Sequence, residues 1–161
     1  MTKKTAKLLL SVFSEKGLTF SSAESCTGGM ICQCITDLAG SSSVVLGGVV
    51  SYSNEVKMKV LGVSPSTLES WGAVSEETAY EMAEGVSRLT GADVSVSVTG
   101  IAGPGGGSAE KPVGTVCFGV TLRGVTRTEK QNFPSDLSRD EIRRLSAAHA
   151  MNMAIDAAKG V

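Results

Sequence analysis

Helical and extended segments alternate along this chain, and this alternation limits the available folds more than any other feature. Apolar residues recur at helical spacing over about residues 2–16, and an extended segment, Leu18–Ala23, follows Gly17. Segments with helical spacing of apolar residues and extended segments continue to alternate in this way to about residue 100. Strands separated by helices favour a parallel sheet with helices on both faces.

We expect about five strands in all. Val44–Tyr52 is mostly apolar, which predicts a strand covered on both faces. Residues 94–99 alternate valine with serine or threonine. Two further strands, at about 113–122 and 125–133, are joined by Arg123-Gly124 as a hairpin, and the polar second strand is expected at an edge of the sheet. The predicted fold class is α/β: a three-layer α/β/α sandwich with a mixed, mostly parallel sheet.

The remaining helices are predicted from their end signals. Ser75 precedes Glu76 and Glu77, which suit the first turn of a helix because carboxylates complement the helix dipole. Ser64-Pro65 indicates an N-cap followed by the first helical residue. After the first helix we expect helices at about residues 30–39, 54–61, 65–71, 76–90 and 138–159.

Length and composition exclude several classes of protein. The 161 residues suit a single domain, 1–161. The 15 Lys and Arg residues nearly balance the 16 Asp and Glu residues and are dispersed, so no nucleic-acid partner is predicted. The longest apolar run, Val44–Val50, is far shorter than the roughly 20 residues that cross a bilayer, so no membrane partner is predicted. No export signal is recognisable, and the expected compartment is the reducing cytoplasm.

Three of the predicted strands end in segments rich in small and polar residues: 23–29, 52–57 and 99–108. Ligands of open α/β sheets bind beyond the carboxyl ends of the strands, so these segments are expected to converge on one pocket. Ser25 lies between a strand and a helix, where its hydroxyl can be exposed beside free N–H groups that stabilise an oxyanion. The alternative is that Ser25 and Thr27 are only N-cap residues.

A serine nucleophile needs a base, which is most often histidine. The only histidine, His149, is expected in the middle of the last helix, far from any strand end, so a Ser-His-Asp triad is disfavoured. Lys57 is an alternative base, because the dipole of its helix disfavours the ammonium form. The competing interpretation is a solvated lysine like Lys59. Cys26 is a weaker candidate nucleophile, because no histidine is available to form its ion pair.

Two other features carry weaker signals. The glycine-rich segment 100–107 matches neither the Walker nor the dinucleotide pattern, yet its amides can form an anion-binding nest; the alternative is a flexible connection. Cys32 and Cys34 point to different sides of a helix, and no second pair or nearby histidine completes a metal site. We therefore predict no metal and no cofactor.

Five motifs together resemble the CinA C-terminal domain family, and the likeness extends from about Leu8 to the last helix. The family includes single-domain nicotinamide mononucleotide deamidases of similar length. They hydrolyse the carboxamide of nicotinamide mononucleotide to give nicotinate mononucleotide and ammonia in pyridine nucleotide recycling. The motifs are AESCTGG (23–29), YSNEVK (52–57), GAVS (72–75), TGIAGP (99–104) and EKPVGTV (110–116).

The resemblance implies a role for each motif residue. Ser25 would be the nucleophile, Lys57 its base, and Tyr52 the hydroxyl that relays or orients the proton. An arginine that opens the last helix would meet the phosphate or ribose. Arg139 is our choice and Arg143 the alternative, because the family's Phe-x-Gly-Asp segment is longer here and lacks its glycine. The resemblance also implies a pocket lined by Glu24, Thr27, Gly28, Thr99, Gly100 and Gly103.

The implied activity is amide hydrolysis of nicotinamide mononucleotide, a small-molecule substrate, without a cofactor. The alternative is a catalytically silent CinA-like nucleotide-binding module that acts through protein partners. The sequence leaves the oligomeric state open, with a homodimer as one option.

Overall fold

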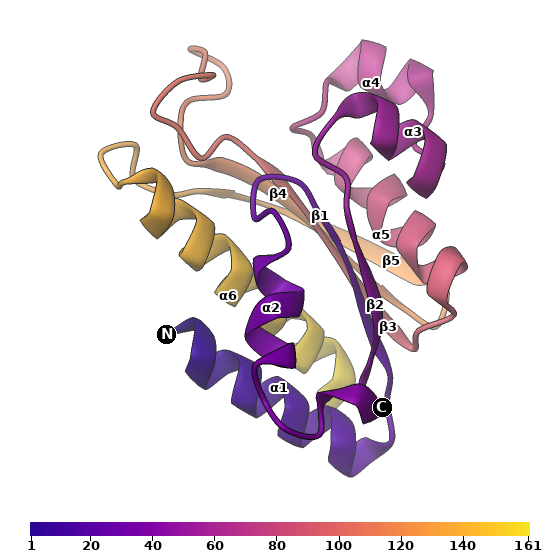
Figure 1. Cartoon of the computed structure of the whole chain (residues 1–161). Coiled ribbons are helices and arrows are strands. Elements are labelled where there is room, and N and C mark those ends of the chain that lie inside the picture. The colour runs from indigo at the N-terminus through magenta and orange to yellow at the C-terminus, as the bar shows by residue number, and fades with distance from the viewer.

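The computed structural model describes all 161 residues, which form one five-stranded sheet between two layers of helices (Figure 1). The strands lie in the order β2-β1-β3-β4-β5. Their bounds are β1 (Phe20–Glu24), β2 (Val45–Val50), β3 (Val94–Gly100), β4 (Thr115–Leu122) and β5 (Val125–Asn132). The helices are α1 (Thr2–Lys16), α2 (Met30–Thr36), α3 (Asn54–Leu61), α4 (Pro65–Trp71), α5 (Glu76–Thr90) and α6 (Arg139–Lys159), with a 3-10 turn, η1 (Ser41–Ser43).

The sheet is mixed, as predicted. β1 pairs parallel with both β2 and β3, and β4 runs antiparallel to β3 and β5. The parallel strands β1, β2 and β3 therefore place their carboxyl ends at one edge of the sheet. The predicted α/β/α architecture and five-strand mixed sheet are confirmed.

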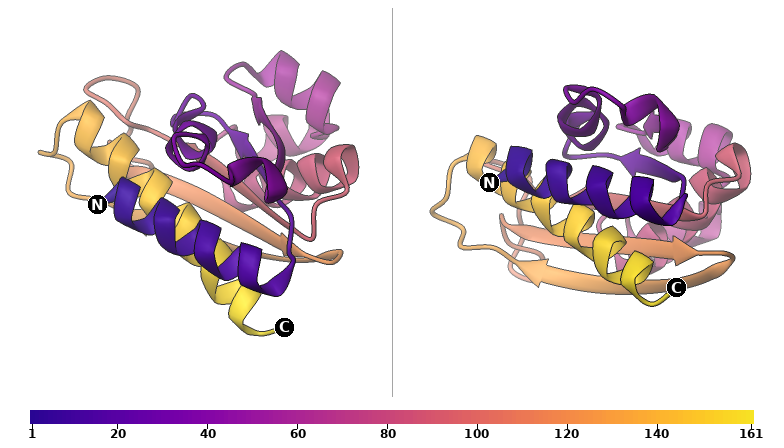
Figure 2. Two further views of the ribbon diagram at one scale, coloured as in Figure 1. Left: turned by 60° about the horizontal axis from the view of Figure 1, so that its bottom comes forward. Right: turned by 90° about the horizontal axis from the view of Figure 1, so that it is seen from below.

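The two faces of the sheet carry different helices. α1 and α6 pack side by side, with α2 next to them, on one face (Figure 2). α5 covers the other face, and α3 and α4 pack on α5. The main hydrophobic core joins α1, α2 and α6 to the sheet, with Phe13, Phe20 and Phe118 among its fully buried side chains. A smaller cluster around Leu61 and Met82 lies between the sheet, α3 and α5.

Several helices begin where the sequence predicts. The Ser75 hydroxyl accepts a hydrogen bond from the backbone N–H of Thr78, and Gly91 ends α5 in a left-handed conformation. Ser138 and Glu141 form a capping box at the start of α6. No helix in the structure combines the length and the hydropathy that a membrane crossing requires.

The placement of β2 is a correction. Its apolar sequence predicted a strand covered on both faces, yet β2 is an edge strand whose residues alternate between half-buried and exposed. Leu46 is 49% exposed and Val50 is 51% exposed. The pattern fails because an apolar run shows that a strand packs well without showing its position in the sheet. The strand that was predicted at an edge, β5, is confirmed there.

Candidate active site

The turn from β1 into α2 places Ser25 at the carboxyl edge of the sheet. The backbone N–H of Ser25 donates to the Val98 carbonyl of β3 at 2.9 Å, which holds the residue beside the neighbouring strand. The chain then reverses through Gly28 (φ +60°) and Gly29 (φ +95°), a conformation that favours glycine. The Ser25 hydroxyl consequently faces the space beyond the strand ends rather than the core.

Lys57 lies beneath this turn. It belongs to α3, which begins after the N-cap residue Ser53, and its side chain is only 1% exposed. Its Nζ lies 3.0 Å from Oγ of Ser25, 2.7 Å from the carbonyl oxygen of Ser51 and 3.4 Å from that of Tyr52. The interpretation of Lys57 as a solvated surface residue is therefore wrong.

Burial changes the acidity of Lys57. Desolvation disfavours its ammonium form and lowers its pKa from the ordinary value, and Lys57 forms no ion pair that would reverse the effect. The sequence suggested the dipole of α3 as the cause, whereas the structure identifies burial. The site thus holds a buried amine with a lowered pKa in contact with a serine hydroxyl.

Ser25 and Lys57 open onto a cavity of about 210 Å³. The predicted convergence of the three strand-end segments is confirmed, because each contributes to the cavity wall. The α4–α5 loop closes another side, held by a hydrogen bond of 2.7 Å from the Thr99 hydroxyl to the Ala73 carbonyl. The lining residues are Ser25, Cys26, Tyr52, Asn54, Lys57, Ala73, Val74, Thr99, Gly100, Ala102 and Arg139.

Arg139 extends from the first turn of α6 across the mouth of the cavity. Its Nη1 donates to the Gly103 carbonyl at 2.7 Å, and its Nη2 donates to the hydroxyl of Tyr52 at 3.0 Å. The Tyr52 side chain is 61% exposed, and its hydroxyl makes no hydrogen bond to Ser25 or Lys57. The structure thus brings Tyr52 to the cavity, but with its hydroxyl held by Arg139.

Glu24 does not line the cavity, which corrects its predicted role. Its carboxylate is 1% exposed and accepts hydrogen bonds from the backbone N–H groups of Gly29, Ile31 and Cys32 at 3.0–3.1 Å. The Ser22 hydroxyl donates a fourth bond. Glu24 therefore caps the N-terminus of α2, where a negative charge complements the helix dipole.

Three further predicted pocket residues also lie outside the cavity wall. Thr27 is fully buried, and its hydroxyl has no hydrogen-bond partner. Gly28 shapes the turn, and Gly103 acts through its carbonyl, which binds Arg139. Four lining residues were not predicted from the sequence: Asn54, Ala73, Val74 and Ala102. All four belong to the YSNEVK, GAVS and TGIAGP motifs, so the motifs indicated the right segments but not these residues.

Cys26 lines the cavity beside Ser25 but is a poor nucleophile. Burial raises the pKa of its thiol to about 12, so the thiol stays protonated at neutral pH. The reactive form of a cysteine is the thiolate, and no histidine lies at the cavity to generate it. His149 lies on α6 instead, with its ring tilted against that of Phe118 and its Nε2 at 3.3 Å from the Glu129 carboxylate. The geometry therefore favours the hydroxyl over the thiol.

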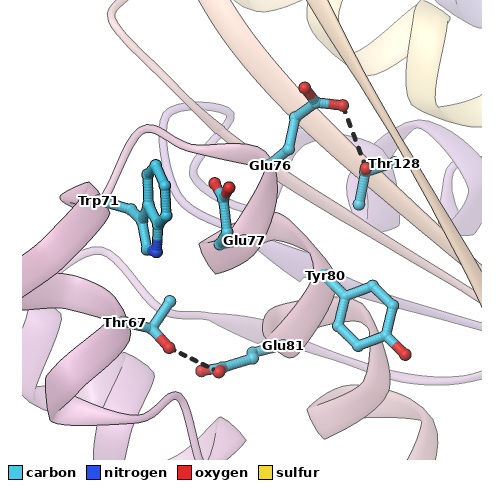
Figure 3. Close-up of a pocket in the computed structure, with 7 residues that line it drawn as sticks. All are labelled: Thr67, Trp71, Glu76, Glu77, Tyr80, Glu81 and Thr128. Atoms are coloured by element: carbon cyan, nitrogen blue, oxygen red, sulfur yellow. Dashed lines mark hydrogen bonds between the residues drawn. The ribbon is translucent and has the colours of Figure 1, made fainter.

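A larger hollow of about 450 Å³ lies between α4, α5 and β5, away from Ser25 (Figure 3). Two of its three carboxylates are engaged within the fold: Glu81 accepts from the Thr67 hydroxyl, and Glu76 from the Thr128 hydroxyl. Its lining contains no serine, cysteine, lysine or histidine, and both of its threonine hydroxyls are bound to these carboxylates. The smaller cavity at Ser25 is therefore the candidate active site.

The fold and the site together define an α/β protein with a buried serine–lysine pair at the carboxyl ends of its parallel strands. The profile of the CinA C-terminal domain matches residues 2–158, and the chain belongs to that family. It is 54% identical over 141 residues to the nicotinamide-nucleotide amidohydrolase PncC of Enterobacter agglomerans, covering 87% of this chain and 85% of that protein.

Other relatives are longer or known as structures. A CinA-like protein of Kosmotoga olearia is 46% identical over 146 residues, which cover 91% of this chain but 35% of the relative. The chain thus spans about a third of that relative's length. The competence/damage inducible protein CihA of Agrobacterium tumefaciens has a crystal structure with a TM-score of 0.94 and 43% identity, covering 97% of this chain and 94% of that one.

Proposed function

We propose that this protein is an amidohydrolase that converts nicotinamide mononucleotide to nicotinate mononucleotide and ammonia. The observation that carries the proposal is the 3.0 Å contact between the buried Lys57 amine and the Ser25 hydroxyl. A serine beside a base with a lowered pKa can attack an amide carbon. The similarity to the amidohydrolase of Enterobacter agglomerans supports the substrate.

The environment of Lys57 suits a general base. A neutral amine has two N–H bonds and one lone pair, and the carbonyl oxygens of Ser51 and Tyr52 can accept the two N–H bonds. The lone pair is then directed at Ser25. Lys57 takes the hydroxyl proton directly as Oγ forms a bond to the carboxamide carbon, and the carbonyl oxygen acquires negative charge. The relay through Tyr52 is not needed.

The nucleophile turn offers a donor for that oxyanion. Every backbone N–H from Ser25 to Cys32 has a protein acceptor except those of Cys26 and Thr27. The Gly28 N–H is bonded to the Ser25 carbonyl at 3.0 Å, and Thr27 is fully buried outside the cavity wall. We assign the oxyanion hole to the N–H group of Cys26, which lines the cavity.

The remaining steps return the enzyme to its starting state. The Lys57 ammonium donates its proton to the carboxamide nitrogen as the C–N bond breaks, which releases ammonia and leaves an ester on Ser25. Lys57 then takes a proton from water as the water oxygen attacks the ester carbon. When the bond between that carbon and Oγ of Ser25 breaks, the Lys57 ammonium returns the proton to Oγ, and nicotinate mononucleotide is released. The cationic pyridinium withdraws electrons from the carboxamide, which favours attack on the nucleotide.

Arg139 is the group that we assign to the phosphate. It lies at the mouth of the cavity, and two of its five N–H donors bind Gly103 and Tyr52, leaving others for an anion. Tyr52 orients this guanidinium through its hydroxyl. The reaction fits pyridine nucleotide recycling in the cytoplasm.

The test is ammonia release from purified protein given nicotinamide mononucleotide, nicotinamide riboside and free nicotinamide in parallel. Turnover of the mononucleotide alone supports both the activity and the phosphate site. Equal turnover of all three removes the phosphate assignment. Binding of the mononucleotide without ammonia release favours the alternative, a silent nucleotide-binding module.

A further inference from the structure

We infer that Arg143 is a positioning residue that holds the oxyanion hole in its working orientation. The inference rests on the proposed serine mechanism. It concerns the contacts that α6 makes with the turn that carries Ser25. Arg143 lies one helical turn after Arg139 on α6 but does not reach the cavity. Its role must therefore come from what it binds.

The contacts of Arg143 are directed at the nucleophile turn. Its Nε donates to the carbonyl oxygen of Cys26 at 3.0 Å, and its Nη2 donates to that of Thr27 at 3.0 Å. The guanidinium also packs on the turn, because a Cβ added at Gly28 would lie 3.4 Å from Nη2. One planar edge of the guanidinium thus binds two successive carbonyls, a geometry that suits its fixed fork of donors.

The geometry of the peptide bond transmits this contact to the reacting side. In a planar trans peptide the C=O and the following N–H point in opposite directions. Fixing the Thr27 carbonyl on Arg143 therefore fixes the Gly28 N–H on the opposite side of that peptide, where it donates to the Ser25 carbonyl at 3.0 Å. The hydrogen bond from the Gly28 N–H to the Ser25 carbonyl fixes the Cys26 N–H in the same way. The Cys26 N–H has no protein acceptor, and it is the proposed oxyanion donor at the cavity.

The charge of Arg143 is not used for an ion pair. Arg144, its neighbour on α6, pairs with Asp140 at 2.6 Å on the exposed side of the helix, whereas Arg143 is half-buried and pairs with no carboxylate. A guanidinium on the carbonyl side also polarises both peptide units, which strengthens their N–H groups as donors. Arg143 therefore acts on the transition state through the backbone, without touching the substrate.

The test compares Arg143→Met and Arg143→Lys with Arg144→Met as the matched control. Loss of an aligned oxyanion donor lowers kcat by about 10²–10³-fold, so we expect a fall of about 10²-fold in Arg143→Met with little change in KM. The kcat of Arg143→Lys should lie between those of the native protein and Arg143→Met, because an ammonium group cannot bind both carbonyls in the geometry of the guanidinium. Arg144→Met should match the native protein.

A second readout does not depend on the proposed substrate. A fluorophosphonate transfers its phosphonyl group to a reactive serine. The Oγ–P bond forms, the P–F bond breaks with release of fluoride, the Ser25 proton passes to Lys57, and negative charge develops on the phosphonyl oxygen. The rate of Ser25 labelling, followed by intact mass, should fall in the Arg143 variants as kcat does. If the native protein is labelled but releases no ammonia from the mononucleotide, the proposed substrate is wrong, and the labelling rates alone decide the role of Arg143.

Chemical rescue separates positioning from general damage. Guanidinium chloride at a low, non-denaturing concentration should restore part of the activity of Arg143→Ala, and sodium chloride at the same concentration should not. If Arg143→Met fails to fold, as judged by circular dichroism, Arg143→Lys carries the test. Unchanged kcat and labelling rate in folded Arg143→Lys and Arg143→Met overturn the inference, as does a raised KM with unchanged kcat, which would place Arg143 at the substrate.

Discussion

Replacement of Lys57 by arginine tests the proposed base most directly. Arginine keeps the positive charge but is not deprotonated in proteins, so it can anchor a charge and cannot accept the Ser25 proton. Loss of a general base lowers the rate by about 10²–10⁴-fold, or about 3–5 kcal/mol of transition-state stabilisation. We expect Lys57→Arg and Lys57→Met to show a loss of this size in kcat for nicotinamide mononucleotide.

The pH dependence supplies a second part of this prediction. Burial lowers the pKa of Lys57, so the base form appears below the ordinary value of 10.5. The kcat/KM of the native protein should rise about tenfold per pH unit below the apparent pKa of the free enzyme and then level off. That apparent pKa belongs to the coupled group of Ser25 and Lys57.

The free energy of unfolding should also depend on pH, because the pKa of Lys57 differs between the folded and unfolded states. Between the lowered folded pKa of Lys57 and its ordinary value of 10.5, the unfolded chain binds the proton more tightly than the folded chain. The free energy of unfolding should therefore rise with pH across that window, and fall as pH drops through the folded pKa. Urea unfolding at a series of pH values should show this rise in the native protein and a smaller one in Lys57→Met.

Lys59→Arg is the matched control, because Lys59 lies on the exposed side of the same helix and pairs with Glu55. It should leave kcat and the pH profile unchanged. Near-normal turnover of Lys57→Arg with the native pH profile would show that Lys57 is not the base. An apparent pKa near 10.5 would show instead that burial does not prepare the amine for catalysis.

Three further predictions follow from the site. Ser25→Ala should abolish ammonia release while nicotinamide mononucleotide still binds in calorimetry, whereas Cys26→Ala should keep most activity; the reverse result would assign the chemistry to the thiol. Arg139→Ala should raise KM by about 10-fold or more with a smaller change in kcat, because binding of a remote phosphate stabilises the ground state and the transition state equally. An unchanged KM would show that Arg139 does not bind the phosphate. Glu24→Gln should cost about 3 kcal/mol, because it replaces a buried charge-assisted acceptor at the start of α2, and should lower Tm by about 10 °C in calorimetry; a native Tm would contradict its capping role.

The helices and the strand connections were predictable because their signals are local. The N-cap residue Ser75 and the helix-ending glycine Gly91 act within a few residues, and α5 forms between them as predicted. The helix expected at residues 30–39 ends earlier, at Thr36. The order of the strands is not local, which is why β2 was misplaced. Gly48 is an example of a constraint that the sequence of β2 does not reveal. A Cβ at Gly48 would collide with the Cys32 side chain of α2, which is far from Gly48 in the sequence.

The candidate site was predictable as a set of motifs but not as a geometry. Lys57 and Leu61 are four residues apart and are the two buried residues of α3, so helical spacing placed the lysine on the apolar face. The expectation that lysines are solvated outweighed that signal. Glu24 shows the opposite error: its position in a motif suggested the pocket, whereas its hydrogen bonds belong to α2.

The arrangement of charges explains why a lysine can be the base in this fold. A carboxylate beside Lys57 would hold its proton and raise its pKa, and the neighbouring carboxylate in the sequence of the turn is Glu24. The N–H groups of α2 bind that carboxylate on their own side, and Glu24 makes no contact with the amine. The acceptors that remain for Lys57 are the neutral carbonyls of Ser51 and Tyr52, whose hydrogen bonds persist after deprotonation. Capping α2 with Glu24 thereby leaves burial as the dominant influence on Lys57 and keeps its amine available to Ser25.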